Sequence, residues 1–334
     1  MKTLAIFFAI SAGACAQNQT PAVANARFES RAFSGNLATQ IRARSAAWFG
    51  YAARTMPGGH SNCCWNQGAP CGWRPDALAP SSVHLEGSPE MVILFRVENN
   101  NVEKIEVYSA DCPLDAGGLP FVWMTGVPAK ASLAYLRSFA SGSAADPMLN
   151  SALLAISMHE DAQADDILEQ LARPAEAPRI REKAIFWMGT NRGARGVAAL
   201  KEILDKDASD QIRAKAVFAL SISKQSDALN LIIWAASNDS SPRVRSQALF
   251  WLAQKAGQRA AATIAGAIEN DPDTEVKKKA VFALSQLPRD EAVPKLIEAA
   301  RSQRNREVRK QAFFWLGQSG DPRALAFIEQ TLMR

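Results

Sequence analysis

The sequence has few of the residues that enzymes commonly use for chemistry. Histidine occurs three times in 334 residues. His84 and His159 stand isolated, and His60 lies among cysteines. No phosphate-binding glycine loop, hydrolase motif or pair of general acid and base residues is recognisable. These absences favour a protein that is not an enzyme, has no catalytic residues and uses no cofactor.

Long hydrophobic runs are missing too, except at the start of the chain. Residues 1–16 combine a basic second residue, an apolar run and small residues around Cys15 that fit an A-x-A cleavage site, which predicts a secretory signal peptide. A lipid anchor on Cys15 is the less favoured alternative, because Ala12 stands where bacterial lipoprotein signals usually carry leucine. No other run approaches the roughly 20 apolar residues of a membrane span. We therefore expect an exported protein, periplasmic or extracellular, with no membrane span.

A strong excess of either charge is absent as well. The chain has 38 basic and 33 acidic residues, which gives a formal net charge of +5. Nucleic-acid binding requires a concentrated basic stripe, and an exported protein seldom meets DNA. No nucleic-acid partner is therefore expected.

Cysteine is scarce, with five in the chain. If Cys15 leaves with the signal peptide, an even number remains in an oxidising compartment, which predicts two disulfides. The remaining cysteines are Cys63, Cys64, Cys71 and Cys112. Adjacent Cα atoms lie about 3.8 Å apart, below the usual disulfide range, so a bond between the first two is the least favoured pairing. One of them is expected to bond to Cys71 and the other to Cys112.

The same region holds the residues that come nearest to a metal or acid site. His60 and His84 flank the cysteines, but the cysteine spacing is not that of a zinc site and disulfide sulfur is not available as a ligand. Asp111 and Asp115 stand near glycines, where they suit an acid site, a calcium ligand pair or a turn. The turn is favoured, and no metal is expected.

Residues 17–127 are predicted to form a small α+β module braced by the disulfides. Its clearest element is a β-hairpin over 91–109, where two β-rich runs flank asparagines that tolerate the positive φ of tight turns. Shorter extended segments are expected at 27–33 and 48–55, with a helix near 37–47.

The rest of the chain is a tandem repeat. Five aliphatic marker residues stand 32 positions apart, and each opens a block of similar sequence, from IREKAIFWMG to VRKQAFFWLG. A period of this length indicates stacked helix pairs, each contacting mainly its neighbours. The markers are Ile180, Ile212, Val244, Val276 and Val308.

The repeat also predicts where the helices lie. N-capping residues stand three positions before four of the markers and begin the second helix of each pair, at Ser209, Ser241, Asp273 and Asn305. First helices are expected over 193–206, 227–237, 259–270 and 290–302. A worn repeat is expected one period earlier, with its first helix over 129–140, and a closing helix over 321–333. The predicted fold is mostly α: over 128–334, a right-handed α-solenoid of about six helix pairs plus a closing helix, with second helices near 148, 180, 212, 244, 276 and 308.

These blocks resemble HEAT repeats of the short bacterial type that is also found in phycobilisome lyase-like proteins, over about residues 129–334. In that family a basic residue follows the marker, and an aspartate sits six positions before that basic residue. The matching residues here are Arg181, Arg213, Arg245, Lys277 and Arg309, with Asp207, Asp239 and Asp271. The resemblance implies a ladder of ion pairs between adjacent units, left incomplete by Ala175 and Gln303. It implies a fold rather than a function, because HEAT arrays serve many roles.

One column of the repeat is unusual. A phenylalanine stands six positions after each marker, about 240° around the helix, on the side that is usually polar in HEAT repeats. These residues are Phe186, Phe218, Phe250, Phe282 and Phe314. The rings either close against each other between neighbouring helices or form an exposed stripe for a partner; we favour packing and leave both open.

The next position alternates between large and small residues. Trp187, Trp251 and Trp315 occupy it in alternate units, with Ala219 and Ala283 between them. Core packing is the favoured interpretation of this alternation, and a row of indole edges along the groove is the other.

Together these observations predict an exported, non-catalytic scaffold that binds a protein or peptide on the concave surface of the solenoid. The phenylalanine and tryptophan columns are the predicted partner-binding residues. The alternative is an enzyme or a lyase-type accessory protein with its chemistry in the N-terminal module, around His60, Asp111 and Asp115.

Overall fold

The computed structural model describes residues 20–57, 88–141, 146–256 and 258–333. The chain divides into two compact units, one of Met1–Ala53 with His60–Pro128 and one of Arg54–Gly59 with Ala129–Arg334. The predicted signal peptide, both histidines of the N-terminal module and three of its four cysteines lie outside the described residues. Export, the disulfides and their connectivity therefore stay predictions.

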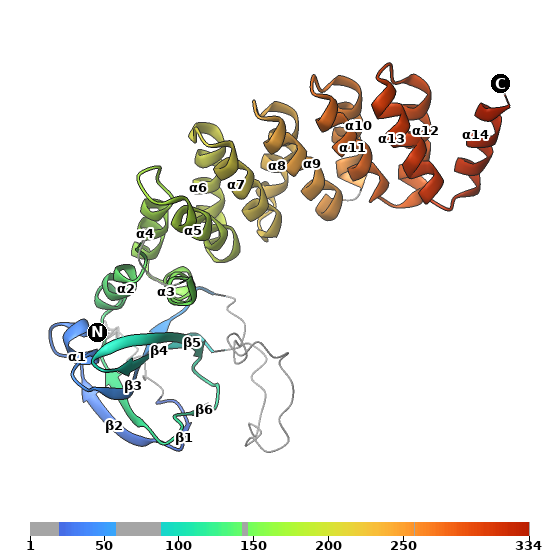
Figure 1. Cartoon of the computed structure of the whole chain (residues 1–334). Helices are drawn as coiled ribbons and strands as arrows, with labels where there is room; N and C mark the ends of the chain where they lie inside the picture. Colours follow the sequence, from blue (N-terminus) through green and yellow to red (C-terminus); the bar gives the residue numbers. More distant parts are fainter. Residues whose placement is uncertain (1–19, 58–87, 142–145, 257, 334) are drawn as a thin grey trace, which may run out of the picture. The chain divides into compact units, whose positions relative to one another are not determined.

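The first unit is built on a five-stranded sheet with the order β2-β7-β3-β4-β5 (Figure 1). Strands β2 (Arg27–Ala32) and β3 (Ala46–Arg54) both pair parallel to β7 (Pro120–Thr125). Strands β4 (Glu90–Glu98) and β5 (Asn101–Ser109) form an antiparallel hairpin. A short parallel pair, β1 (Val23–Ala24) and β6 (Leu114–Asp115), and the helix α1 (Leu37–Ile41) complete the unit.

The hairpin lies where the sequence predicts it. Asn99 and Asn100 have φ values of 49° and 61°, in the left-handed region that the tight turn requires. The register of the hairpin shifts between Arg96 and Val97, close to the turn.

The helix predicted over 37–47 is wrong beyond residue 41. α1 has five residues, and Ala46 already belongs to β3. Phe49 and Tyr51 are almost fully buried from this strand, each 1% exposed. Burial in the sheet thus decides the conformation of a segment whose local sequence is compatible with a helix.

The second unit is a stack of helix pairs (Figure 1). Within the described residues there are six pairs and a closing helix, as the repeat predicts. The pairs are α2 (Ala129–Ser138) with α3 (Asp146–Met158), α4 (Gln163–Leu171) with α5 (Pro178–Asn191), α6 (Gly193–Lys206) with α7 (Asp210–Ile222), α8 (Asp227–Asn238) with α9 (Pro242–Ala256), α10 (Gln258–Asn270) with α11 (Thr274–Ser285), and α12 (Arg289–Ser302) with α13 (Arg306–Gln318). The closing helix is α14 (Pro322–Leu332).

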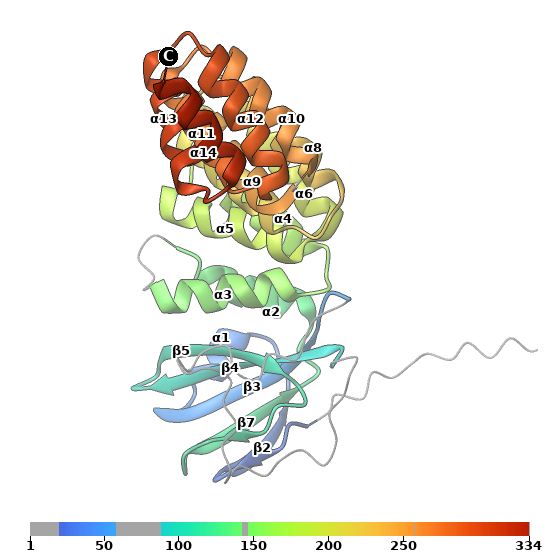
Figure 2. The same ribbon diagram turned by 90° about the vertical axis from the view of Figure 1, so that its right-hand side faces the viewer.

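The stack has two layers (Figure 2). The second layer contains α3, α5, α7, α9, α11 and α13, each of which packs on the next, and the first layer contains the other member of each pair. Within the unit the second layer follows the inner side of the curve (Figure 1). In the part of the chain that the structure describes, no helix is long and apolar enough to cross a membrane.

Three columns of the repeat form the core of the stack. The marker aliphatics are at most 2% exposed, the alanines four positions later are fully buried, and the leucines or methionine eight positions later are at most 2% exposed. Side chains of Ser209, Asp273 and Asn305 accept hydrogen bonds from backbone N–H groups of the following turn, so these residues cap the second-layer helices.

Close approach of two second-layer helices depends on one glycine. A Cβ atom added to Gly189 of α5 would lie 2.3 Å from the backbone oxygen of Ala219 in α7. Gly317 stands at the same repeat position in α13 and has no atom within 4 Å of such a Cβ. The same residue type therefore has a packing role in one unit and none in the other.

We expect Gly189→Ala to lower the free energy of unfolding by about 1–3 kcal/mol, because the added methyl group pushes two helix backbones apart. Gly317→Ala is the matched control and should raise it by up to about 1 kcal/mol through helix propensity. Urea denaturation measures both. A stabilised Gly189→Ala variant would contradict the close approach.

Candidate functional site

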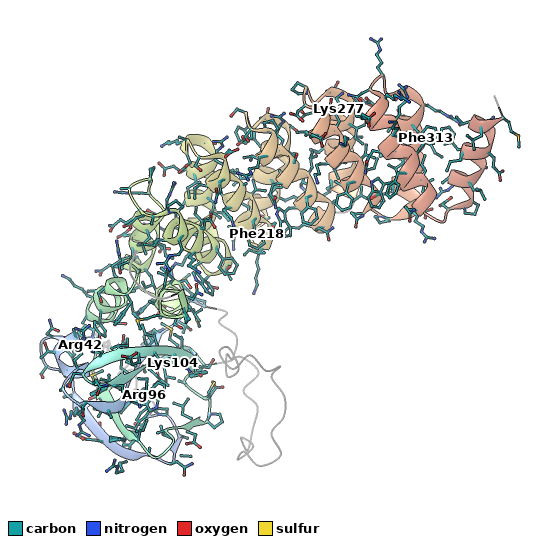
Figure 3. The ribbon with its side chains drawn as sticks, viewed as in Figure 1. Arg42, Arg96, Lys104, Phe218, Lys277 and Phe313 are labelled. Carbon is teal, nitrogen blue, oxygen red and sulfur yellow. The ribbon has the colours of Figure 1, made fainter. Side chains whose placement is uncertain are left out.

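The phenylalanine and tryptophan columns form one continuous row of rings on the second layer (Figure 3 shows Phe218 at its surface). Between units, the ring centroids of Phe186 and Phe218 are 6.1 Å apart and those of Phe218 and Trp251 are 5.0 Å apart. The corresponding distances further along are 6.4 Å for Phe250 to Phe282 and 5.3 Å for Phe282 to Trp315. Within α5, α9 and α13, the phenylalanine contacts the tryptophan beside it edge to face, at 4.9–5.1 Å.

We call this row the aromatic ribbon. In spatial order it consists of Trp187, Phe186, Phe218, Trp251, Phe250, Phe282, Trp315 and Phe314. It crosses α5, α7, α9, α11 and α13.

The ribbon is packed and exposed at the same time. Four of its phenylalanines and two of its tryptophans are half-buried. Trp187 is 6% exposed, and Phe314, at the other end, is 54% exposed. The phenylalanines therefore pack on their neighbours, as the favoured interpretation expects, and they also keep one side at the surface. Whether that side binds a partner stays a prediction.

The alternation of tryptophan with alanine has a packing role. Trp251 receives the ring of Phe218, and Trp315 receives that of Phe282, each from the unit before. Ala219 and Ala283, in the units between, are fully buried. Trp251 and Trp315 thus pack against a ring of the unit before, which is consistent with the favoured packing interpretation.

The structure brings the ladder residues together in three pairs. The Arg213 guanidinium donates two hydrogen bonds to the Asp239 carboxylate, both 2.8 Å long, and Arg245 donates to Asp271 at 2.7 and 2.9 Å. Arg181 donates one hydrogen bond to Asp207 through Nη2, and its Nε donates to the carbonyl of Ala172 at 2.8 Å. These side chains are at least nine-tenths buried.

Each arginine also fixes a turn in its own unit. Arg213 donates to the carbonyl of Asp207 at 2.8 Å, and Arg245 donates to that of Asp239 at 2.9 Å. The hydrogen bonds that the guanidinium groups donate to the aspartate carboxylates raise the pKa of both arginines above the ordinary value. One side chain therefore ties two neighbouring turns together.

Ladder partners are 26 residues apart in the sequence. The positions at which the ladder is interrupted lie at the same spacing. Lys277 would face Gln303, and its ammonium instead donates to the carbonyl of Glu269 at 2.7 Å (Figure 3). Arg309 donates to the carbonyls of Gln303 and Arg304. At the other end of the stack, Leu149 stands where later units have the basic residue. Ala175, at the position of its ladder partner, stands where they have the aspartate. Both positions of the Leu149–Ala175 pair are therefore uncharged, which leaves no buried charge without its partner. Lys277 keeps its charge and uses a backbone carbonyl as its acceptor.

A buried polar cluster that the sequence does not reveal lies at the start of the stack. Arg192, 3% exposed, donates to the Asp165 carboxylate at 2.6 and 2.7 Å and to the carbonyls of Ser157 and His159. The His159 ring is also buried, with Nε2 3.1 Å from the Ser132 hydroxyl. Burial lowers the pKa of His159 to about 4.

This cluster connects four helices of the first units and has no regular spacing in the sequence. The one local signal is Arg192 itself, since other units carry Lys224, Ala256, Pro288 or Gly320 at that position. The donors and acceptors of this cluster hydrogen-bond to one another, so the cluster holds the helices at the start of the stack together.

In the N-terminal unit, Asp115 has the turn-forming role that the sequence favours. Its carboxylate accepts hydrogen bonds from the backbone N–H of Gly117 at 2.8 Å and from the Asn25 amide at 2.9 Å, and these lower the pKa of the carboxyl group. Asp111 is exposed, and Cys112 is buried.

Stacked helix pairs tied by buried arginine–aspartate pairs define an α-solenoid. The family model described as HEAT repeats matches residues 164–253, 229–314 and 260–333 in overlapping segments, about half of the chain. The chain belongs to the HEAT-repeat family, and the resemblance noted in the sequence is confirmed.

Several solved structures are similar to this chain. Human deoxyhypusine hydroxylase, in complex with glycerol, is 18% identical, with a TM-score of 0.32, over 57% of this chain and 74% of that one. YibA of Escherichia coli is 16% identical, with a TM-score of 0.36, over 61% and 76%. A chain in the CpcE–CpcF complex of the phycocyanin lyase from Nostoc is 23% identical, with a TM-score of 0.36, over 46% and 99%. No curated protein sequence matches.

We expect Asp239→Asn to lower the free energy of unfolding by about 3 kcal/mol or more, because it leaves the buried Arg213 without its counter-charge. Asp205→Asn is the control: it removes an exposed pair with Lys201 and should cost less than about 1 kcal/mol. Equal effects of the two changes in urea denaturation would contradict a structural role for the ladder.

The buried His159 predicts a pH dependence of stability. Its pKa is about 4 in the folded chain and 6.5 in the reference state, so the unfolded chain binds the proton more tightly. Its contribution, up to about 3 kcal/mol, is full above roughly pH 6.5 and is lost as the pH falls towards 4. His159→Gln, which does not titrate, should show a shallower decline in urea denaturation over that range; an unchanged slope would contradict this account.

Proposed function

We propose that the protein is an exported, non-catalytic scaffold that binds a protein or peptide on the aromatic ribbon. The observation that carries this proposal is the continuity of the ribbon across five helices together with the partial exposure of its rings. Contiguous apolar surface of this kind commonly marks a binding site.

Stability of the stack does not require phenylalanine at these positions. The three buried columns already provide the contacts between units, and they lie on the opposite side of each second-layer helix. Several positions near the phenylalanines on the same face are polar and exposed, among them Gln254, Gln286 and Gln318. Binding of a partner explains better than packing why each of these units has an aromatic ring on a solvent-exposed face.

A repeated surface also suits an extended partner. Because each unit presents the same ring in the same place, a long segment can make one contact after another along the inner side of the curve. The features of residues 1–16 support export, and the HEAT-repeat family supports a scaffold role.

The alternative function, chemistry in the N-terminal module, has weaker support. Of its candidate residues, Asp115 is used to fix a turn, and Asp111 is exposed.

The test compares the wild-type chain with the variant Phe218→Ser/Phe250→Ser/Phe282→Ser. We expect the triple variant to stay folded, because these rings are half-buried outside the three core columns, and to lose at least roughly tenfold of its captured partner in cross-linked envelope pull-downs. Circular dichroism and thermal unfolding report whether it folds.

Trp234→Ser provides a matched control. Trp234 is an aromatic residue of α8, in the other layer, and is 42% exposed. Its replacement should leave the captured partners unchanged. A folded triple variant with the same partners as the wild type would rule out the ribbon as the binding surface.

A further inference from the structure

The two edges of the aromatic ribbon differ in charge. Two and three positions after each marker, one helical turn before the phenylalanine, stand five lysines and a single acidic residue, Glu182. The lysines are Lys183, Lys215, Lys278, Lys279 and Lys310. Ten positions after each marker, on the other edge, the residues are a threonine, an isoleucine and three glutamines, all uncharged.

The basic edge holds most of the excess charge of the protein. If the residue before each marker is included, it carries seven basic and three acidic side chains, a difference of +4, against +5 for the whole chain. Lys215 pairs with Glu182 at 3.1 Å, and Lys278 and Lys310 pair with glutamates on their own helices at 2.9 and 3.1 Å. Such exposed pairs are worth at most about 1 kcal/mol each, so an acidic ligand can replace them.

Ring geometry narrows the class of ligand. Phe186 and Phe218 stack with 25° between their planes, and Phe250 and Phe282 stack with 8° between theirs. Their facing surfaces are therefore occupied by each other. Bases of a single-stranded nucleic acid bind by stacking on open ring faces, whereas burial of aliphatic side chains is non-directional and can use ring edges as well. The ribbon thus favours a peptide over a nucleic acid.

The repeat distance narrows the conformation of that peptide. Packed helices lie about 8–10 Å apart, so successive units of the stack repeat at about that interval, although the rings of Phe186 and Phe218 and those of Phe250 and Phe282 lean together to 6.1 and 6.4 Å. A polyproline-II segment has three residues per turn and rises about 9.3 Å per turn, which brings one side chain to each unit. Same-face side chains of a β-strand recur after about 6.6–6.8 Å and fall out of register.

We propose that the aromatic ribbon binds an acidic peptide segment in the polyproline-II conformation, with an apolar side chain at every third position and carboxylates directed at the lysine edge. This inference rests on the proposed binding function and specifies the chemistry of the partner. The ring edges supply the apolar contacts, and the charge difference between the two edges sets the direction in which the acidic side chains point.

Synthetic peptides test the ligand class. The probes are fluorescein-labelled repeats of Leu-Pro-Glu and of Leu-Pro-Lys, each about 15 residues and five polyproline turns long, and single-stranded oligothymidine. Fluorescence anisotropy with the full mature chain should show that the glutamate peptide binds at least roughly tenfold more tightly than the lysine peptide, with an affinity that falls as salt is added. Equal affinity for the two peptides, or tighter binding of oligothymidine, would overturn the proposal.

Charge-reversal variants test the lysine edge. Lys215→Glu/Lys279→Glu should weaken binding of the glutamate peptide at least roughly tenfold. Lys201→Glu/Arg259→Glu, on α6 and α10 of the first layer, makes the same change in net charge and should leave the affinity within about twofold. Equal losses in both variants would mean that net charge alone attracts the peptide, against a specific edge.

The two proposals fail in different ways. If the triple phenylalanine variant loses its natural partner but no peptide prefers the wild-type lysine edge, the ribbon is a binding surface and the acidic polyproline-II partner is wrong. If the folded triple variant keeps its natural partner, both proposals are wrong.

Discussion

A single helix pair of this chain cannot bury its apolar face alone, and every other feature of the second unit follows from that constraint. The marker aliphatic, alanine and leucine columns are buried only because the next pair covers them. Stacking in turn requires the backbones of neighbouring second-layer helices to approach closely, which Gly189 permits in one unit. The apolar columns provide the driving force for stacking but do not by themselves select one register.

The buried ion pairs supply that register. Arg213 and Arg245 each join the turn of their own unit to the aspartate 26 residues further on, and both side chains are buried. A displaced register would leave a guanidinium group and a carboxylate buried apart, at a cost of several kcal/mol. We therefore infer that the ladder contributes more to selecting one stacking register than to the stability of the stack. With the register set, the aromatic residues of successive units align into the ribbon.

Several parts of this structure could be predicted from the sequence and others could not. The boundaries of α6 follow from the repeat, because each unit sees almost the same neighbours. The ion pairs between adjacent units, such as Arg213 with Asp239, follow from the resemblance to HEAT repeats. The short α1 could not be predicted, since a sheet contact to β7, distant in the sequence, determines where it ends. The buried cluster of Arg192, Asp165 and His159 was missed for a related reason: it occurs once, where the regular repeats meet the worn one, and no periodicity marks it.

The sequence by itself determined the architecture of the repeat region and the face of each helix on which the phenylalanines lie, because a fixed period repeats both the core positions and the surface positions. Only the tertiary structure decided that those rings stack on one another and stay half-exposed. Helical periodicity gives the direction of a side chain, whereas its burial depends on how closely the neighbouring helix approaches and on which residue, Trp251 or Ala219, that neighbour presents. Those are properties of the packed stack, absent from any single repeat.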